Sequence, residues 1–253
     1  MRGRDVAARM GEHFADWHNV PQGPLDTVVC VKYWDPVIRE IRKRCKRLIV
    51  DALDCWSQTH PMWQPADFWQ WVQTETQCDL MLGCSPSAVE TMQAAGCEAV
   101  CAPHHADERI GTDWYNADGP IVYAGGERFL GDERPRIEAA CKALGREFVC
   151  RFDKDCWQAL NGAALSLCVR FGKERTPLAL IAKPTVKIAN AARGRIPTLA
   201  TMDSAITSLC PPGSSALFDG GWHNSIANGL AGLPPIYPWT LDTHCTLIRK
   251  LAG

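Results

Sequence analysis

Short apolar runs alternate with amphipathic helical segments along most of the chain, and this alternation limits the possible folds more than any other feature. The apolar runs form two blocks, at 27–33, 48–54, 79–84 and 98–102, and then at 120–126, 147–151, 164–169 and 196–200. Strands that alternate with helices favour parallel sheets, because each helix returns the chain to the end of the sheet where the previous strand began. The pattern therefore predicts an α/β protein with two Rossmann-like, doubly wound domains that face a cleft.

The composition is that of an ordinary globular protein. The chain has 253 residues, of which 46% are hydrophobic and 22% charged, enough for one large domain or two of roughly 100–150 residues each. No run of about 18 apolar residues occurs, which excludes a membrane span. The amino terminus has no apolar segment typical of a signal peptide. We therefore expect a cytoplasmic protein.

The cysteines give no indication of a disulfide framework or a zinc site. There are thirteen of them in the chain. The number is odd, and no two cysteines have the Cys-x-x-Cys spacing of a zinc ligand pair. We interpret them as reduced, mostly buried thiols, and the sequence predicts no metal.

The stretch 183–200 carries the clearest indication of a binding site. Pro184 suits the first turn of a helix, Gly194 suits its end, and Ile196–Ala200 follows as a short strand. A helix that begins beside a strand end offers backbone N–H groups and a positive dipole end, which favour an anion. The residues that we expect to hold a phosphate at this helix start are Lys183, Thr185 and Lys187.

The same stretch resembles the donor-site segment of GT-B-type glycosyltransferases, in which a polar residue, then Ala, then Gly-x-Pro leads into a short strand. In the commonest branch of that superfamily two glutamates flank this helix. Ala182 and Asn190 occupy their positions here, and Ala182 is a departure, because the first glutamate contacts the donor sugar in those enzymes. We expect Asn190 to hydrogen-bond the donor ribose.

The resemblance extends to the domain organisation. It implies an acceptor-side domain at 1–105, a donor-binding domain at 119–238 and a C-terminal helix at 239–253 that crosses back to the first domain. The first strand of the usual acceptor-side domain is absent from the sequence, so we expect that domain to be short of one strand. The acceptor-side candidates in the first domain are Arg2, Arg4 and His104.

Further donor-site candidates follow the strands of the second block. Gly125 and Gly126 end the strand at 120–126, where a glycine backbone can approach a ligand closely. Arg170 and Lys173 follow the strand at 164–169. A guanidinium and an ammonium group at a strand end are suited to a diphosphate.

Two carboxylates and one basic segment in the first domain are the remaining candidates. Asp51 and Asp54 end the strand at 48–54, where a general base is useful if the reaction inverts the anomeric carbon, although one of them can equally cap a helix. The predicted helix 36–47 is densely basic and includes Arg42 and Lys46. Its outer face is either simply solvated or meets a polyanionic acceptor such as viral DNA with hydroxymethylated bases.

The resemblance to GT-B-type enzymes implies a glycosyltransferase that moves a sugar from a nucleoside diphosphate sugar, a UDP-sugar above all, to a hydroxyl acceptor without a bound metal or other cofactor. Two alternatives remain open: a nucleotide-sugar-binding protein without activity, and a sugar-nucleotide epimerase of the same fold. The sequence leaves open the sugar, the acceptor and the stereochemical outcome.

Overall fold

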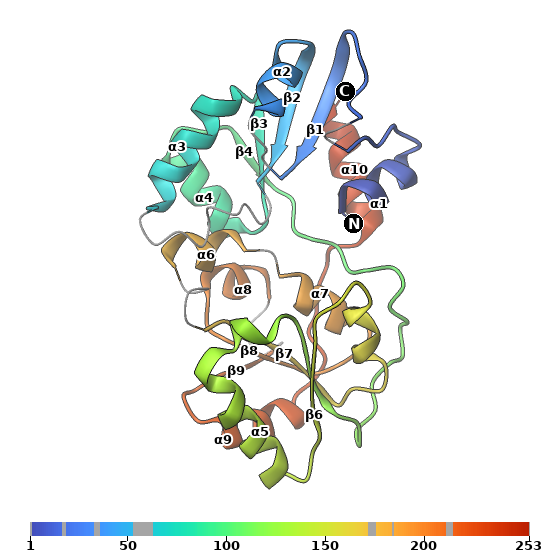
Figure 1. Ribbon diagram of the computed structural model, residues 1–253, viewed down its shortest axis with the longest axis vertical. Helices are drawn as coiled ribbons and strands as arrows, with labels where there is room; N and C mark the ends of the chain where they lie inside the picture. Colours follow the sequence, from blue (N-terminus) through green and yellow to red (C-terminus); the bar gives the residue numbers. More distant parts are fainter. Residues whose placement is uncertain are drawn as a thin grey trace. The chain divides into compact units, whose positions relative to one another are not determined.

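The computed structural model describes residues 2–16, 19–32, 36–52, 63–171, 176–183, 185–210 and 215–252, with Arg2 and Ser204 described by their backbone alone. The chain forms two compact α/β units (Figure 1). Unit 1 comprises residues 1–105, 176–184 and 239–253, and unit 2 comprises residues 106–175 and 185–238. Each unit is built on its own parallel sheet.

The sheet of unit 1 has four strands in the order β1-β2-β3-β4. These strands are β1 (Leu25–Val31), β2 (Cys45–Asp51), β3 (Leu80–Gly83) and β4 (Ala99–Cys101). The helices of the unit are α1 (Arg2–Met10), α2 (Val37–Arg42), α3 (Pro65–Thr76), α4 (Pro86–Ala94), α6 (Pro177–Ala182) and α10 (Leu241–Ala252). Because every crossover advances in the same direction, α2, α3 and α4 cover the same face of the sheet.

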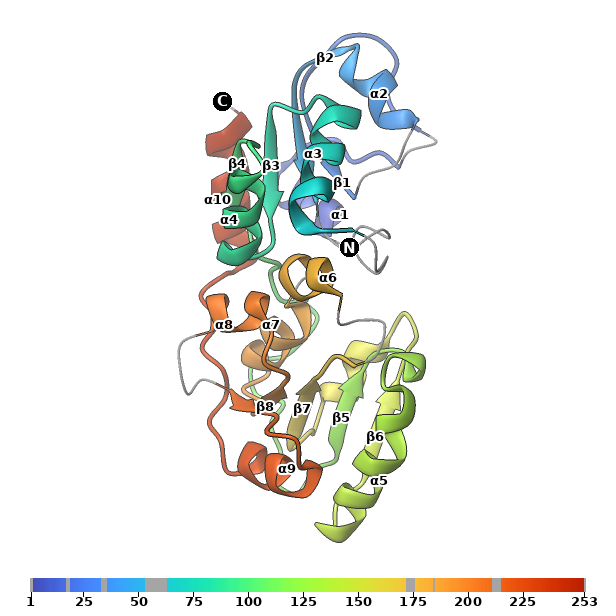
Figure 2. The same cartoon turned by 90° about the vertical axis from the view of Figure 1, so that its left-hand side faces the viewer.

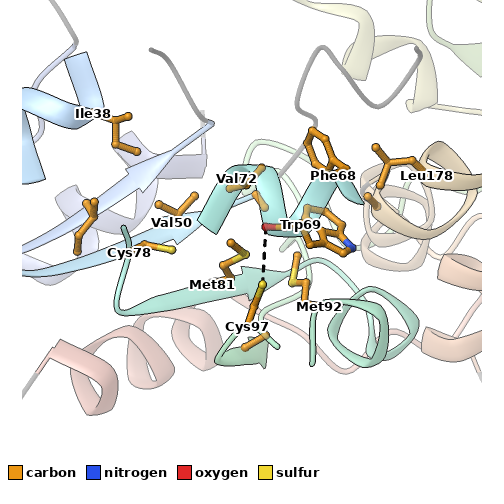
Figure 3. Close-up of a cluster of buried hydrophobic side chains, with 14 of the residues drawn as sticks. Ile38, Val50, Phe68, Trp69, Val72, Cys78, Met81, Met92, Cys97 and Leu178 are labelled. Carbon is orange, nitrogen blue, oxygen red and sulfur yellow. Dashed lines mark hydrogen bonds between the residues drawn. The ribbon is translucent and has the colours of Figure 1, made fainter. Parts of the chain in front are cut away.

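The strands of unit 1 are buried on both faces. Val50 of β2 packs with α2, α3 and α6, in a cluster that includes Phe68, Trp69 and Leu178 (Figure 3). The next residue toward the start of β2, Ile49, points to the opposite face, because side chains alternate along a strand. There it packs with α1 and α10. Figures 1 and 2 show both helices on this side of the sheet.

The sheet of unit 2 has five strands in the order β6-β5-β7-β8-β9. They are β5 (Ile121–Ala124), β6 (Phe148–Arg151), β7 (Leu165–Cys168), β8 (Thr198–Ala200) and β9 (Ala216–Leu217). Its α-helices are α5 (Arg134–Ala143), α7 (Val186–Arg193), α8 (Ser204–Leu209) and α9 (Trp222–Leu230), with short 3-10 turns η2 (Glu127–Phe129), η3 (Gly131–Glu133) and η4 (Cys156–Leu160).

The strand order of unit 2 reverses once. The chain leaves β5 for β6 on one side and then returns to β7 on the other side of β5. Helices α5 and α9 pack on one face of the sheet, with Ile137 and Ile226 in the core. On the other face Ala191 of α7 packs against Val122. In open α/β sheets ligands bind at the carboxyl ends of the two strands that flank such a reversal, here β5 and β7.

The structure confirms the α/β class with parallel sheets, whereas several predicted elements differ. The predicted helix 36–47 ends at Arg42, because Cys45–Asp51 pairs with β1 from Leu25↔Cys45 onward. Lys46 and Arg47 therefore belong to a strand. Helix α6 and strand β9 were not predicted.

Two segments of unit 1 come from the later part of the chain. The predicted domains assigned 176–184 to the second domain, and these residues pack in unit 1. Helix α10 also packs in unit 1, where Leu241, Cys245 and Ile248 join the cluster around Val6 of α1. The Sγ of Cys84, after β3, lies 3.1 Å from the carbonyl oxygen of Ala182 and holds α6 to the sheet.

Candidate functional site at the carboxyl edge of the second sheet

At the carboxyl end of β5, the ring of Tyr123 lies close to Gly125. Tyr123 is 2% exposed. A Cβ at Gly125 would lie 2.9 Å from two carbon atoms of its ring, closer than such atoms approach each other. A Cβ at Gly126 would meet the Phe129 ring at 3.1 Å. A side chain at Gly125 would therefore force the Tyr123 ring to move, which explains this glycine without any ligand, whereas a side chain at Gly126 would need only a small shift of the Phe129 ring.

Lys187 lies over the same ring. It is in the first turn of α7, half-buried, and its Nζ is 4.9 Å from the centroid of the Tyr123 ring, a cation–π contact. Burial raises the pKa of the Cys168 thiol, at the end of β7, to about 12, and the Lys187 charge acts in the opposite direction. Burial also raises the pKa of Cys150 on β6, again against a smaller effect of Lys187. The ammonium group therefore lies near the ends of β5, β6 and β7.

Arg170 follows β7 and is held by the turn that follows β8. Its Nη1 lies 3.2 Å from Oδ2 of Asp203, and the two side chains are 11% and 0% exposed. Its backbone N–H donates to the hydroxyl of Thr201 at 3.2 Å. Burial raises the pKa of Tyr123, and the Arg170 charge is among the effects that oppose this rise. Lys187 thus lies over the Tyr123 ring, and Arg170 follows the neighbouring strand β7.

Tyr123, Thr201 and Asp203 were not among the predicted site residues. Asp203 had a usable signal, because an aspartate that follows a strand and precedes a helix suits an N-cap. Its Oδ1 accepts a hydrogen bond from the backbone N–H of Ile206 at 3.0 Å and caps α8. The sequence pattern did not distinguish Tyr123, because a tyrosine in an apolar strand is expected to serve packing alone.

The start of α7 differs from the prediction. Thr185 is its N-cap residue, 3% exposed, but its hydroxyl does not cap the helix and lies 3.1 Å from that of Tyr237. Lys183 is the C-cap residue of α6 and belongs to unit 1, whereas Lys187 belongs to unit 2. The two lysines that were expected to flank one helix start are therefore in separate units.

Asn190 binds the chain segment 107–110, near the start of unit 2. Its Oδ1 accepts a hydrogen bond from the backbone N–H of Asp107 at 2.9 Å. One turn later, Nε of Arg193 donates to the carbonyl oxygen of Ile110 at 2.6 Å. This side of α7 thus holds residues 107–110 in place, and the contact of Asn190 with a donor ribose stays a prediction.

The carboxylate candidates are in unit 1. Asp51 ends β2 and is 1% exposed. Burial raises the pKa of the Cys30 thiol on β1 to about 12, and the Asp51 charge adds to this effect. A general base must reach the hydroxyl that it deprotonates, so the burial of Asp51 does not favour this role. Asp54 and Lys173 lie outside the described residues, as does the side chain of Arg2.

The other acceptor-side candidates have partners within unit 1. The guanidinium carbon of Arg4, an exposed residue, lies 5.4 Å from the centroid of the Phe14 ring. His104 is half-buried, and its Nδ1 donates to the carbonyl oxygen of His105 at 2.6 Å. His105 is buried, with Nε2 3.8 Å from Oδ2 of Asp5. These contacts connect the segment after β4 to α1.

The basic segment 39–47 is largely neutralised by acids. Nη1 of Arg42 lies 2.9 Å from Oδ2 of Asp79, and Nζ of Lys46 lies 2.6 Å from Oδ1 of Asp26. The other ion pairs of this segment are Arg39 with Glu75 and Lys43 with Glu40. A shallow pocket of about 550 Å³ beside these residues is lined by Arg39, Arg42, Lys43, Cys45, Thr74, Glu75, Thr76 and Gln77. Four cations of the positive patch expected from the sequence therefore lie in ion pairs, and a fifth, Arg44, donates to the carbonyl oxygen of Pro21.

Neither a metal site nor a membrane-spanning helix is found among the described residues. Within the described ranges, no three His, Cys, Asp or Glu side chains come together as a metal site. None of the helices in the described part of the chain is long and apolar enough to cross a membrane. In comparisons with known proteins, no family model and no curated protein matches this chain. The fold and the local chemistry are therefore the basis for any functional proposal.

Proposed function

We propose that the protein is a glycosyltransferase that takes a sugar from a nucleoside diphosphate sugar, and that unit 2 binds this donor at the carboxyl edge of its sheet. One observation carries the proposal. Lys187 from α7 lies over the ring of Tyr123 on β5, and Arg170 follows β7, the neighbour of β5 at which the strand order reverses. Two cations from separate elements at such a point suit a ligand with two linked phosphates.

The start of α7 supports the same ligand. The helix dipole is positive at this end. The hydroxyl of Thr185 lies 3.1 Å from that of Tyr237 and does not cap the helix, whereas the carbonyl oxygen of Thr185 accepts a hydrogen bond from the backbone N–H of Ile188 at 2.9 Å. Lys187 adds a full charge in the same turn. A positive helix end and an ammonium group together favour a phosphate over a neutral ligand.

The role of this edge in the reaction would be to stabilise the leaving group. The acceptor oxygen forms a bond to the anomeric carbon and gives up its proton to water or to the departing diphosphate, the bond from that carbon to the diphosphate oxygen breaks, and the diphosphate leaves with the electron pair. Fixed positive groups that match the charge developing on that oxygen lower the barrier. The proposal assigns no general base, because Asp51 is buried.

The acceptor that we propose is a glycan or a small molecule rather than DNA. DNA binding draws its affinity from cations that neutralise phosphates. In unit 1 the cations of the basic segment are already opposite acids, as in the pairs Arg42–Asp79 and Lys46–Asp26. The chain also has a net charge of −1, which gives no general attraction to a polyanion.

A protein that only binds the nucleotide sugar is the second candidate. The burial of Asp51 favours a protein that only binds, because this buried carboxylate is not accessible to an acceptor hydroxyl. The two candidates differ in donor hydrolysis. A transferase releases nucleoside diphosphate slowly with water as the acceptor, whereas a binding protein gives saturable binding without release.

The test is a thermal-shift screen of UDP, ADP, GDP and their common sugar conjugates, followed by a hydrolysis assay with the conjugates that bind. A ligand at about 100 times its dissociation constant stabilises the folded state by about 2.7 kcal/mol, which is readily measured. Stabilisation by at least one conjugate, with release of its diphosphate, supports the transferase. If none of these compounds stabilises the protein, the proposed function is wrong.

A further inference from the structure

Phe152 is a large apolar side chain that is exposed at the carboxyl edge of the second sheet. It follows β6 directly, and 69% of it is exposed. Strands β5 and β6 lie side by side (Figure 2), and their register pairs Ala124 with Arg151. The next residues of the two strands, Gly125 and Phe152, therefore leave the sheet next to each other. This exposed ring is thus beside the end of β5, where the phosphate site is proposed.

The ring also lies against the glycine turn that follows β5. A Cβ at Gly126 would lie 3.7 Å from Cγ of Phe152, an ordinary van der Waals distance. Just before the ring in the chain, the thiol of Cys150 donates to the carbonyl oxygen of Gly125 at 3.5 Å. The ends of β5 and β6 are therefore in contact, and the Phe152 ring stands at the glycine turn with most of its surface accessible.

The backbone that carries Phe152 is held by hydrogen bonds to Asp153. Its Oδ2 accepts from Nε of Arg151 and its Oδ1 from the backbone N–H of Asp155, both at 2.7 Å. Its carbonyl oxygen accepts from the backbone N–H of Cys156 at 3.2 Å. Ordering a mobile segment costs binding free energy. Because these bonds already fix the turn, an exposed ring at this position can pack on a ligand at a smaller cost.

Lys187 lies near both ends of the segment 150–156. Burial raises the pKa of Cys150 and of Cys156, and the Lys187 charge acts in the opposite direction on each thiol. The ammonium group itself lies over the Tyr123 ring of β5. A ligand whose phosphates are bound at Lys187 is therefore close to the segment that carries Phe152.

The charges around the ring favour a neutral part of that ligand. Arg151 and Lys154 balance Asp153 and Asp155, so this turn has no net attraction for a phosphate. A nucleobase is flat and uncharged, and bases stack on aromatic side chains. We propose that Phe152 stacks on the base of the donor nucleotide, which extends from the phosphate site toward β6. This inference rests on the proposed function, because it assigns a base subsite to the same donor site.

The other side of the sheet offers a different neighbour. Met202 is 62% exposed in the turn after β8, and β8 is separated from β5 by β7. A thioether is apolar, but it has no flat face on which a base can stack. Between these two side chains, Phe152 is the one whose shape matches a base, and the two make opposite predictions about where the base lies.

The experiment measures the affinities of UDP and of inorganic pyrophosphate by calorimetry for wild type and single variants. We expect Phe152→Ser to weaken UDP binding roughly fivefold to 100-fold, the contribution typical of one base stacked on an aromatic side chain. Phe152→Tyr keeps the ring and should bind UDP like wild type. Pyrophosphate has no base, so its affinity should be the same for wild type and Phe152→Ser.

The matched control is Leu233→Ser. Leu233 is another exposed apolar residue of unit 2, 78% exposed, and it follows α9. Its replacement removes a similar exposed apolar side chain away from the ends of β5 and β6, so UDP affinity should not change. An equal loss of UDP affinity in Leu233→Ser would contradict a specific role of Phe152.

Three further results would overturn the inference. The first is unchanged UDP affinity in Phe152→Ser, above all if Met202→Ser weakens UDP binding, because the base would then lie on the β8 side. The second is an equal loss of pyrophosphate affinity in Phe152→Ser, because the residue would then act on the phosphates. The third is a loss confined to a UDP-sugar with UDP unaffected, because the ring would then contact the sugar.

Failure of the inference can be distinguished from failure of the proposed function. If wild type binds no nucleoside diphosphate, both are wrong. If wild type binds UDP and Phe152→Ser binds it equally well, only the base subsite is wrong. Urea denaturation checks that the variants fold, and if Phe152→Ser does not fold, Phe152→Leu decides instead. Leucine keeps an apolar side chain without the flat ring, so wild-type UDP affinity in Phe152→Leu would overturn the stacking role.

Discussion

Replacing Lys187 is the most direct test of the phosphate site. The substitution Lys187→Met removes the charge and keeps an unbranched side chain over Tyr123, where the ammonium now lies 4.9 Å from the ring centroid. A hydrogen bond to a charged group contributes about 1.5–3 kcal/mol. Since about 1.4 kcal/mol corresponds to a tenfold change in affinity, we expect UDP to bind roughly 10- to 100-fold more weakly.

The same substitution should change stability only slightly. Lys187 is half-buried, and the lost cation–π contact is worth about 0.5–1 kcal/mol at sites of this kind. Methionine restores part of the packing against the ring. Urea denaturation should therefore give a free energy of unfolding within about 1 kcal/mol of wild type. This measurement separates a loss of binding from a loss of folding.

Calorimetric titration with UDP at low and high salt is the assay, and Lys142→Met is the matched control. Lys142 is in the last turn of α5, exposed and in the same unit. Its removal changes the net charge of the protein by the same amount. Unchanged UDP affinity in folded Lys187→Met would refute the assignment of Lys187 to the site. An equal loss of UDP affinity in Lys142→Met would also refute this assignment, because the effect would then come from the net charge of the protein.

Three further predictions follow from other parts of the structure. Gly125→Ala should destabilise the protein by about 1–3 kcal/mol, because its Cβ would lie 2.9 Å from ring carbons of Tyr123; Gly221→Ala, where the nearest atom is 3.7 Å away, is the control in urea denaturation, and equal stability of the two variants would contradict the reasoning. Wild type should not be retained on duplex DNA at low ionic strength, since the basic segment is paired with acids; retention that weakens steeply with salt would restore the DNA acceptor. The Cys168 thiol, with its pKa raised to about 12 by burial, should be protonated at pH 8 and resist iodoacetamide in the native state, because only the thiolate reacts; mass spectrometry that finds it labelled as fast as in urea would be evidence against this burial.

The sequence predicted which residues lie at one edge of the second sheet better than it predicted the contacts among them. Gly125, Arg170 and Lys187 were all identified because they follow strands or begin a helix, and strand ends of a parallel sheet share one edge. Their partners were not identified. Tyr123 is an ordinary strand residue by pattern, and Asp203 is separated from Arg170 by 33 positions of chain. A side-chain contact between two loops depends on which strands are neighbours, and the strand order is not contained in the hydrophobic pattern.

The basic segment 39–47 gives the clearest difference between sequence and structure. By composition it is a run of cations with a single acid, Glu40. The acids that pair with Arg39 and Arg42 are Glu75 and Asp79, at the end of α3 and just before β3. They come close only because β2 lies between β1 and β3 in the sheet. Local composition counts charges, whereas the potential at a surface depends on all charges that the fold brings together.

The sequence by itself therefore determined the elements that local forces control. The period of apolar residues fixed the α/β class, and Gly194 ends α7 as expected, although the left-handed residue is the following Arg195, with φ 56°. The tertiary structure alone decided the order of the strands in each sheet, that α6 packs in unit 1, and that Lys183 and Lys187 are in different units. The physical reason is that periodicity reports which face of an element is buried, whereas the partner of that face is chosen by packing between segments far apart in the chain.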